Sequence, residues 1–408
     1  MKGSDVKVAP VIAIVICFAL FRDLDIVSLK TKAKFPSLAV AIVAYLIAIW
    51  CGMPKTYPDV SGLAALGDIL FPVFVAGLAT SILPISIVKN WKFVIIGCIA
   101  VLADFLCTVV VGGLFYDPRE MFAAAMTTCG SGLTGGLIVL DRLKGTGLTE
   151  MVTIPLLLAC TIDAIGQPVG SLITRKYAGK LIASDAYLTD KIVDHSDGGK
   201  LNKWGAPFNS SENPSPRFCA WIPPKYETEA VAFLQLIVVT ALAMWLGGIT
   251  GLGWSIVLIL LGFGGTFIGL FRMNMLDRTQ TGGFVMAAIY ALLFQMLNDM
   301  TLQEIMAKIV PLLLVILLSG VGLVLGGMLG AKVFGFDPWL GASATIGLFY
   351  LFPGVRNVIN EVARSLSRNE EERLYLVEKI SPSCIIAASM GSKFCLLAGV
   401  LLMPLIIR

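Results

Sequence analysis

The sequence predicts an all-α polytopic membrane protein of ten transmembrane helices in two inverted repeats, each with a re-entrant hairpin. Three observations support this prediction. Of the 408 residues, 57% are hydrophobic and 14% are charged, with a mean hydropathy of +0.86, whereas about a quarter of the residues of a soluble domain are charged. Apolar runs of spanning length recur along the chain, and a Gly-rich stretch recurs at the same place in each half.

The spans follow from segments of roughly 16 to 25 mainly apolar residues, about the length that crosses a hydrocarbon core. The polar segment 174–228 separates repeat 1 (1–173) from repeat 2 (229–408) and is predicted to be a connector. No small-x-small cleavage site follows the first segment, so a span is favoured there over a signal peptide. The ten segments are 6–21, 35–53, 63–82, 92–115 and 149–173, then 230–249, 253–271, 281–297, 309–336 and 383–406.

Two semi-apolar stretches, 119–141 and 338–363, lie between the fourth and fifth spans of their halves. Both are rich in Gly, Ala, Ser and Thr, and we interpret them as re-entrant hairpins. Irregular backbone at membrane depth is tolerated where protein or a wet cavity satisfies its polar groups, so these hairpins are expected to line a pathway. Extra spans or surface loops are the alternative.

The distribution of positive charge sets the expected orientation. Most of the 31 Lys and Arg residues fall on one side of the predicted spans, including those of the connector. Because cytoplasmic loops carry the excess of Lys and Arg, both termini are predicted to lie outside and the connector 174–228 in the cytoplasm.

The two halves also resemble each other locally. The run 121–130 (MFAAAMTTCG) occupies the place of 339–347 (WLGASATIG), and each is followed by a span that we expect to begin at a proline, Pro155 or Pro382. Five spans and one hairpin in each half invert the second half relative to the first. This order is typical of inverted-repeat transporters.

The first hairpin offers hydroxyls and open backbone without bulky side chains. Carbonyl and hydroxyl oxygens at broken helices are the usual sodium ligands of transporters, so Thr127 and Thr128, with Thr345 of the second hairpin, are candidate ion ligands. Substrate contacts are predicted at Ser131, Gly132 and Thr134. The alternative is a helix-packing face, since Gly132 and Gly136 have GxxxG spacing.

The second hairpin leads into an amphipathic helical pattern that begins at Pro353. The N–H groups and positive dipole end of such a helix favour an anionic group. Gly354, Arg356 and Asn357 are therefore candidate substrate residues. For Arg356 an anchoring role at the cytoplasmic surface is the alternative. The acidic residues 370–372 are interpreted as a solvated turn before the last span.

Three ionisable residues fall deep in predicted spans: Asp104, Asp163 and Lys393. Intramembrane charge is a functional-site hypothesis by default. Counted from the prolines of the fifth spans, Asp163 and Lys393 take nearly equivalent positions and are candidates for an ion pair. Such a pair is either structural or opened by a competing cation or proton. Asp104 is the alternative partner for Lys393.

Other chemistries find little support. No C-x-x-C pair occurs, and the cysteines are interpreted as small packing residues. The single histidine, His195, lacks a second histidine for zinc binding or catalysis. Nucleotide-binding GxxxxGK[ST], metalloprotease HExxH and GxSxG patterns are missing from the sequence, so no enzymatic activity is expected. A net charge of +4 is too small to indicate a nucleic-acid partner.

The layout resembles the bacterial sodium/glutamate symporter family over most of the chain. The likeness is carried by 67–82 (GDILFPVFVAGLATSI) and by 121–173, the first hairpin with its following span. The segments 341–357 and 380–399 also resemble the beta subunits of sodium-pumping decarboxylases within the same superfamily, which includes 2-hydroxycarboxylate transporters. The sequence departs from both patterns: it has Cys129-Gly130-Ser131-Gly132 in place of a Gly-Gly-His-Gly hairpin, and it lacks the decarboxylase hairpin aspartate.

The resemblance implies a homodimeric secondary transporter of the bacterial inner membrane. One bundle carrying both hairpins would slide against a scaffold, an elevator-type movement, with a small organic anion such as glutamate or another carboxylate bound near the hairpin tips. Sodium or a proton is the expected coupling ion, with no covalent cofactor. The rival functions are a sodium/proton antiporter using Asp163 and Lys393, and a membrane subunit of a decarboxylase with soluble partners on 174–228.

Overall fold

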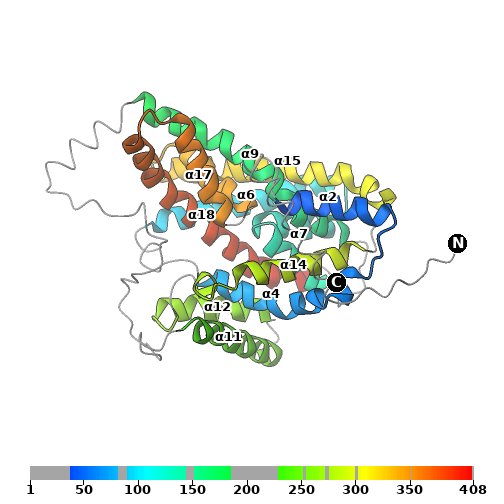
Figure 1. Ribbon diagram of the computed structural model, residues 1–408. Coiled ribbons are helices and arrows are strands. Elements are labelled where there is room, and N and C mark those ends of the chain that lie inside the picture. Colours follow the sequence, from blue (N-terminus) through cyan, green and yellow to red (C-terminus); the bar gives the residue numbers. More distant parts are fainter. Residues whose placement is uncertain are drawn as a thin grey trace. The chain divides into compact units, whose positions relative to one another are not determined.

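The computed structural model describes residues 37–80, 90–143, 151–184, 228–250, 254–271, 275–298, 302–350 and 352–406. Within these ranges every regular element is helical, and they contain no strand (Figure 1). The predicted span 6–21 and most of the connector 174–228 lie outside the described residues. The all-α class is confirmed.

Within the described ranges, four helical stretches are long and apolar enough to cross a membrane, and a fifth is added if one bent helix counts as a single span. The bent helix is α9 (Thr153–Ala183), whose two parts meet at 46° near Ala164. Because several other apolar helices are shorter, ten spans remain a prediction. The four stretches are Trp91–Leu114, Glu229–Thr250, Met306–Val333 and Glu370–Met403.

The chain forms two compact units, and each draws on both sequence halves. Unit 1 comprises Met1–Ser81 and Pro216–Ala307, and unit 2 comprises Ile82–Ser215 and Lys308–Arg408. The described helices of unit 1 are α2 (Ser37–Trp50), α3 (Tyr57–Val60), α4 (Leu63–Ala79), α11 (Glu229–Thr250), α12 (Trp254–Phe267), α13 (Met275–Arg278) and α14 (Gly282–Leu297).

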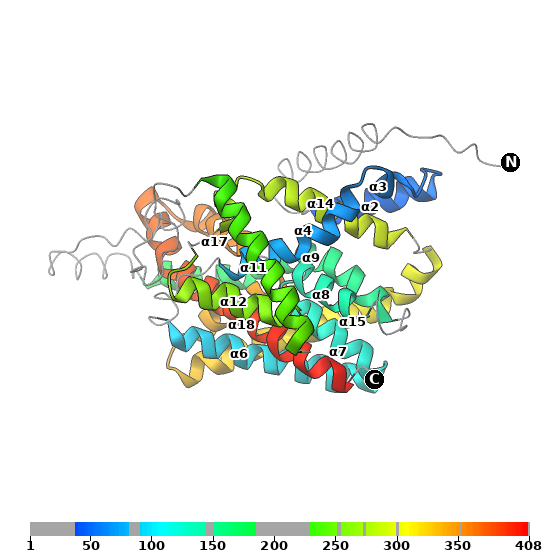
Figure 2. The ribbon, with the colours of Figure 1, turned by 90° about the horizontal axis from the view of Figure 1, so that it is seen from below.

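Close helix contacts and one polar cluster hold unit 1 together. Helix α4 packs along α14, where a methyl group on Gly67 would overlap the Ala288 carbonyl. Helices α11 and α12 lie side by side (Figures 1 and 2). Tyr45 stacks on Phe294 with ring centroids 4.3 Å apart, and its hydroxyl donates to the Asn298 side chain at 2.7 Å. Residues far apart in sequence therefore share one core.

Unit 2 contains both stretches predicted to be re-entrant hairpins, 119–141 and 338–363, and their re-entry into a membrane stays a prediction. In each of them a helix is interrupted and a second helix follows. Its elements are α6 (Trp91–Phe105), the π-helix η1 (Leu106–Val111), the 3-10 helix η2 (Gly112–Leu114), α7 (Pro118–Cys129), α8 (Leu133–Leu143), α9, α15 (Leu302–Val333, from Lys308 on), α16 (Pro338–Ile346), the 3-10 helix η5 (Gly347–Phe349), α17 (Phe352–Leu366) and α18 (Glu370–Ile406).

A glycine ridge on α15 brings that helix against α6. Methyl groups on Gly322 and Gly326 would lie 2.6 Å from the Asp104 Cα and 2.7 Å from the Ala100 Cα, respectively. Gly330 faces Ile96 one turn further along. The contacts run in opposite sequence directions, so the two helices are antiparallel. Spacing of small residues by four explains this close approach.

Replacing Gly326 with alanine is expected to destabilise unit 2 by about 1–3 kcal/mol, because the added methyl group must displace the α6 backbone. Gly248 in α11 is the matched control, since no heavy atom lies within 4 Å of an added methyl there. Gly248→Ala is expected to be neutral or slightly stabilising. Thermal unfolding of the purified variants measures both changes, and equal midpoints would contradict the packing role of Gly326.

The two interrupted segments of unit 2 begin in the same way. Asp117 and Asp337 each precede a proline and accept a hydrogen bond from the backbone N–H two residues later, both at 2.8 Å. This is the N-cap geometry in which proline fits the first helical position. The shared Asp-Pro cap is a second local likeness between the halves.

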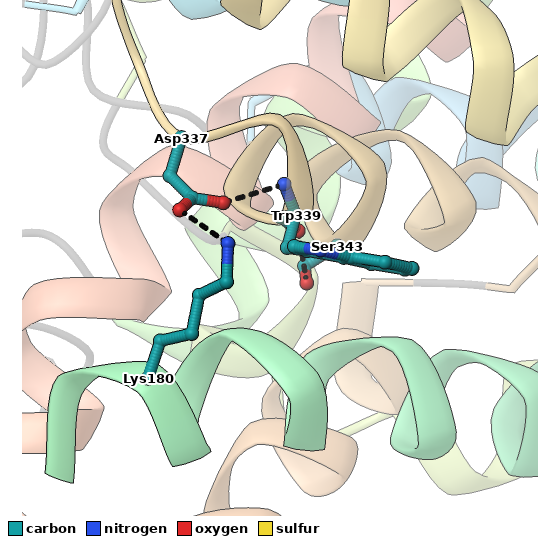
Figure 3. A network of polar contacts seen from close by, with 4 residues as sticks. All are labelled: Lys180, Asp337, Trp339 and Ser343. Atoms are coloured by element: carbon teal, nitrogen blue, oxygen red, sulfur yellow. Dashed lines mark hydrogen bonds and ion pairs between the residues drawn. The ribbon is translucent and has the colours of Figure 1, made fainter. Parts of the chain in front are cut away.

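These segments start at opposite ends of α15. Glu120 in the first turn of α7 pairs with Lys308 near the start of α15 at 2.6 Å. Helix α16 instead begins directly after α15 ends. There, Lys180 near the end of α9 pairs with Asp337 at 2.9 Å, as Figure 3 shows. The two interrupted segments, which begin with α7 and α16, therefore enter the core of unit 2 from opposite ends of α15.

Asp337→Ala is expected to lower stability by about 1 kcal/mol because the α16 cap is lost. Asp337→Asn keeps a capping oxygen and removes only the half-exposed ion pair with Lys180, which contributes little. The asparagine variant should therefore unfold close to the parent temperature. If both variants unfold at the same lowered temperature, the ion pair rather than the cap is the stabilising contact.

Three boundary predictions differ from the structure. Residues 370–372 are not a turn: they form the first turn of α18, where Asn369 Oδ1 accepts from the Glu372 N–H at 2.7 Å and caps the helix. Pro382 therefore lies inside α18 rather than at its start. Helix α9 continues to Ala183, ten residues beyond the predicted end at 173, where Lys176 packs over the Trp339 ring at 4.3 Å.

Candidate ion and substrate site

The first break, residues 130–132, joins α7 to α8 (Figure 2). Ser131 and Gly132 have positive φ angles of 67° and 56°, and the Gly132 N–H donates to the Thr127 carbonyl at 3.0 Å. Glycine adopts this left-handed conformation without strain, which explains why the helix is interrupted here. Ser131 is partly exposed, whereas its neighbours in α7 and α8 are buried.

The second break, residues 347–350, joins α16 to α17 through η5. Tyr350 is extended, with φ −131° and ψ 154°, and is buried. The α9 surface accommodates this segment with glycines: a methyl group on Gly166 would lie 2.8 Å from the Phe349 Cβ, and one on Gly170 would overlap the Tyr350 hydroxyl. The second break is therefore packed on the middle of α9.

The two breaks meet beside Asp163 of α9. A methyl group on Gly132 would lie 3.2 Å from the Phe349 carbonyl oxygen and 3.6 Å from Asp163 Oδ1. It would also overlap the side chain of Ile162. The bend of α9 near Ala164 falls at the same level. One carboxylate, one backbone carbonyl and a glycine without a side chain thus converge at one point in unit 2.

Two buried side-chain oxygens of unit 2, Asp163 Oδ1 and Thr134 Oγ1, have no hydrogen-bond partner among the described residues. Buried polar atoms almost always have a partner, so an unpaired one calls for an explanation such as an ion or water. Asp163 as a whole is partly exposed. These oxygens are chemically suited to a hard cation, because carboxylate, hydroxyl and carbonyl oxygens are hard ligands.

Asp104 lies elsewhere in unit 2 and is fully buried among neutral donors. Its Oδ1 accepts from Thr108 at 3.0 Å, and its Oδ2 accepts from Cys129 at 2.7 Å. The Thr128 hydroxyl lies 3.4 Å from Oδ2 and donates to the Ala125 carbonyl at 3.0 Å. Ser319 of α15 donates to the Thr128 hydroxyl at 2.9 Å. Asp104 therefore ties α6 to the end of α7.

Lys393 does not pair with Asp163: among the described residues, no ion pair joins the two. Lys393 is partly exposed on α18, close in sequence to residues that touch both breaks. Gly391 packs on Leu348, and Leu396 packs on Gly130. Lys393 thus lies at the level of the breaks, but on α18 and not on α9.

The remaining candidate residues differ in how close they lie to the two breaks. Thr127 donates to the Ala123 carbonyl at 3.0 Å, and Thr345 donates to the Leu323 carbonyl at 2.8 Å, so both hydroxyls have backbone partners. Gly354 lies in the first turn of α17, against Tyr350. Arg356 is partly exposed and Asn357 is exposed. The structure brings Gly132, Thr134 and Gly354 close to the breaks and leaves Asn357 at the surface.

Several residues of the site have weak sequence signals. Thr108 and Gln167 follow Asp104 and Asp163 by four positions, so helical spacing places each on the same face as its aspartate. Gln167 Nε2 lies 3.4 Å from a methyl group built on Gly354. Ser319 and the Phe349 carbonyl have no comparable signal, because their roles depend on how distant helices pack.

Comparison of the sequence with models of known protein families gives no match, and comparison with curated protein sequences gives none either. The symporter resemblance therefore remains an expectation from the sequence.

Proposed function

We propose that the protein is a secondary active transporter that couples sodium or proton movement to symport of a small organic anion. One observation carries the proposal: two helix breaks, entering unit 2 from opposite ends of α15, meet beside a carboxylate oxygen that has no hydrogen-bond partner. Broken helices at mid-depth are a typical way in which transporters expose backbone groups to ions and substrates.

In this proposal Asp163 binds the coupling cation, together with the Thr134 hydroxyl and the Phe349 carbonyl. The cation replaces the missing hydrogen-bond partners and neutralises the carboxylate, which is costly to bury alone. Ser131 at the first break, with Gly354 and Arg356 at the start of α17, binds the carboxylate of the organic anion. A bound cation lowers the cost of bringing an anion to the same place, which makes the two binding events cooperative.

The division into units suggests which part moves. Unit 2 contains both breaks and Asp163, so the proposed ion and substrate groups belong to one compact body. We propose an elevator-type movement in which unit 2 carries the bound solute across the membrane while unit 1 remains in place. Within unit 2 the glycine contacts of α15 with α6 keep the moving helices close together.

Reconstitution in proteoliposomes tests the proposal. Radiolabelled glutamate or a dicarboxylate should accumulate under an inward sodium or proton gradient, and collapse of the gradient should stop accumulation. Sodium-driven proton movement without any solute would instead identify an antiporter. The absence of both activities in correctly folded protein would exclude symport of these solutes and antiport.

A further inference from the structure

The strongest further candidate is the polar cluster around Asp104. It comprises Asp104 of α6, Thr108 of η1, Thr128 of α7 and Ser319 of α15. All four side chains are buried, Asp104 and Thr108 with no exposed surface. Three stretches of chain, α6 with η1, α7 and α15, therefore bring a carboxylate and three hydroxyls into one place.

The hydrogen-bond pattern suits an ionised carboxylate. Thr108 and Cys129 donate to the two Asp104 oxygens at 3.0 and 2.7 Å, and the Thr128 hydroxyl, which donates to the Ala125 carbonyl at 3.0 Å, lies 3.4 Å from Asp104 Oδ2. An ionised carboxylate only accepts, so it uses both the Thr108 and the Cys129 donor, whereas a protonated acid places its own hydrogen toward one of them. The cluster is thus arranged around a negative charge.

Among the described residues, no basic side chain balances the negative charge of Asp104 in an ion pair. An isolated ionised carboxylate in a buried site is unfavourable unless a cation accompanies it. The nearby hydroxyls also have lone pairs that can turn toward a cation.

Two features of the backbone near Asp104 shape this cluster. The π-helix η1 begins at Leu106, directly after α6, and wide turns of this kind are frequent at functional sites. Gly322 lets α15 approach Asp104 so closely that a methyl group there would lie 2.6 Å from the Asp104 Cα. Without this approach Ser319 would not reach Thr128.

We propose that Asp104, Thr108, Thr128 and Ser319 form a second sodium site, separate from the site beside Asp163. The inference rests on the proposed function and extends it to two cations per chain. Asp104 contacts the residues that precede the first break, and Asp163 lies against the residue that ends it. Two cations would therefore hold the first break from both of its ends, which links their binding to the position of α7 and α8.

Sodium binding to the purified full-length protein tests the inference, with radioactive sodium as the probe in equilibrium dialysis. The parent protein should bind two sodium ions per chain, and Asp104→Asn and Asp163→Asn should each bind one. Ser319→Ala should weaken one of the two sites about tenfold or more, because a ligand to a charged group is lost. Ser343→Ala is the matched control, since the buried Ser343 hydroxyl donates to the Trp339 carbonyl of its own helix at 2.7 Å.

Two bound ions in Asp104→Asn, or unchanged binding in Ser319→Ala, would overturn the inference. If Asp104→Asn does not fold, Ser319→Ala and Thr108→Ala decide the question, because both keep the carboxylate. A parent protein that binds a single ion, lost in Asp163→Asn, would overturn the second site and leave the proposed symport standing. Two bound ions without any solute accumulation would retain the second site and reject symport.

Discussion

Asp163→Asn is expected to abolish ion-driven accumulation of the organic anion in proteoliposomes, with a loss of about 100-fold or more. The substitution keeps the size of the side chain and removes the charge that binds the proposed coupling cation. Removing one partner from a buried charged pair costs about 3–5 kcal/mol, which corresponds to at least two orders of magnitude in affinity. Initial uptake rates at fixed gradient measure the effect.

Asp59→Asn is the matched control for this substitution. Asp59 is exposed in α3 of unit 1, so loss of its charge should leave uptake unchanged. Folding of Asp163→Asn is checked by its elution as a single species and by its thermal unfolding. Uptake by folded Asp163→Asn at the parent rate, with the same ion dependence, would exclude Asp163 as the coupling site.

Gly132→Ala is expected to have the second largest effect, again by abolishing accumulation. Gly132 has a φ of 56°, which costs a residue with a side chain about 1–3 kcal/mol. The added methyl group would also overlap Ile162 and occupy the space between the Phe349 carbonyl and Asp163. Ion affinity should therefore fall together with transport.

Gly179→Ala provides the control for Gly132→Ala. Gly179 lies in α9 of the same unit, and an added methyl group there meets no heavy atom within 4 Å. Its uptake should equal that of the parent protein. If Gly132→Ala transports normally, the first break does not need the geometry seen in the structure, and the ion site does not include the space beside Gly132.

Local composition predicts the position of the breaks better than any other feature. Three glycines and a serine within residues 130–135 permit positive φ angles, so the interruption near 131 follows from the residues themselves. The amphipathic pattern of α17 is equally local, and its apolar face is buried as expected at Val355, Val358 and Ile359. Neither prediction depends on knowing the tertiary contacts.

Long-range packing explains most of what the sequence did not predict. Apolar periodicity does not distinguish a π-helix from an α-helix, so η1 was not expected within the span 92–115. Hydropathy predicted that the last span starts at 383, whereas α18 begins at Glu370. The first turns of α18 are charged and therefore fall outside an apolar window. The capping contact of Asn369 with Glu372 is the signal that would have extended the helix.

For the candidate ion-binding residues, too, local sequence predicts one part of the site and long-range packing determines the other. Asp104 and Asp163 are identified by charge within apolar segments, which is a local signal. Their surroundings are not local: Ser319 and the Phe349 carbonyl reach the two aspartates only through the packing of unit 2. Equivalent positions after a proline predicted an Asp163–Lys393 pair, but Pro382 does not begin α18, so the two counts have no common origin.

The meeting of the two breaks beside Asp163 is tested most directly by a cryo-electron microscopy map of the full-length protein in lipid nanodiscs with sodium present. We expect interrupted helices at 130–132 and 347–350, with the Phe349 carbonyl adjacent to Gly132 and density for an ion at Asp163. An unbroken helix through either stretch, or a Phe349 carbonyl remote from both Gly132 and Asp163, would contradict the proposed site.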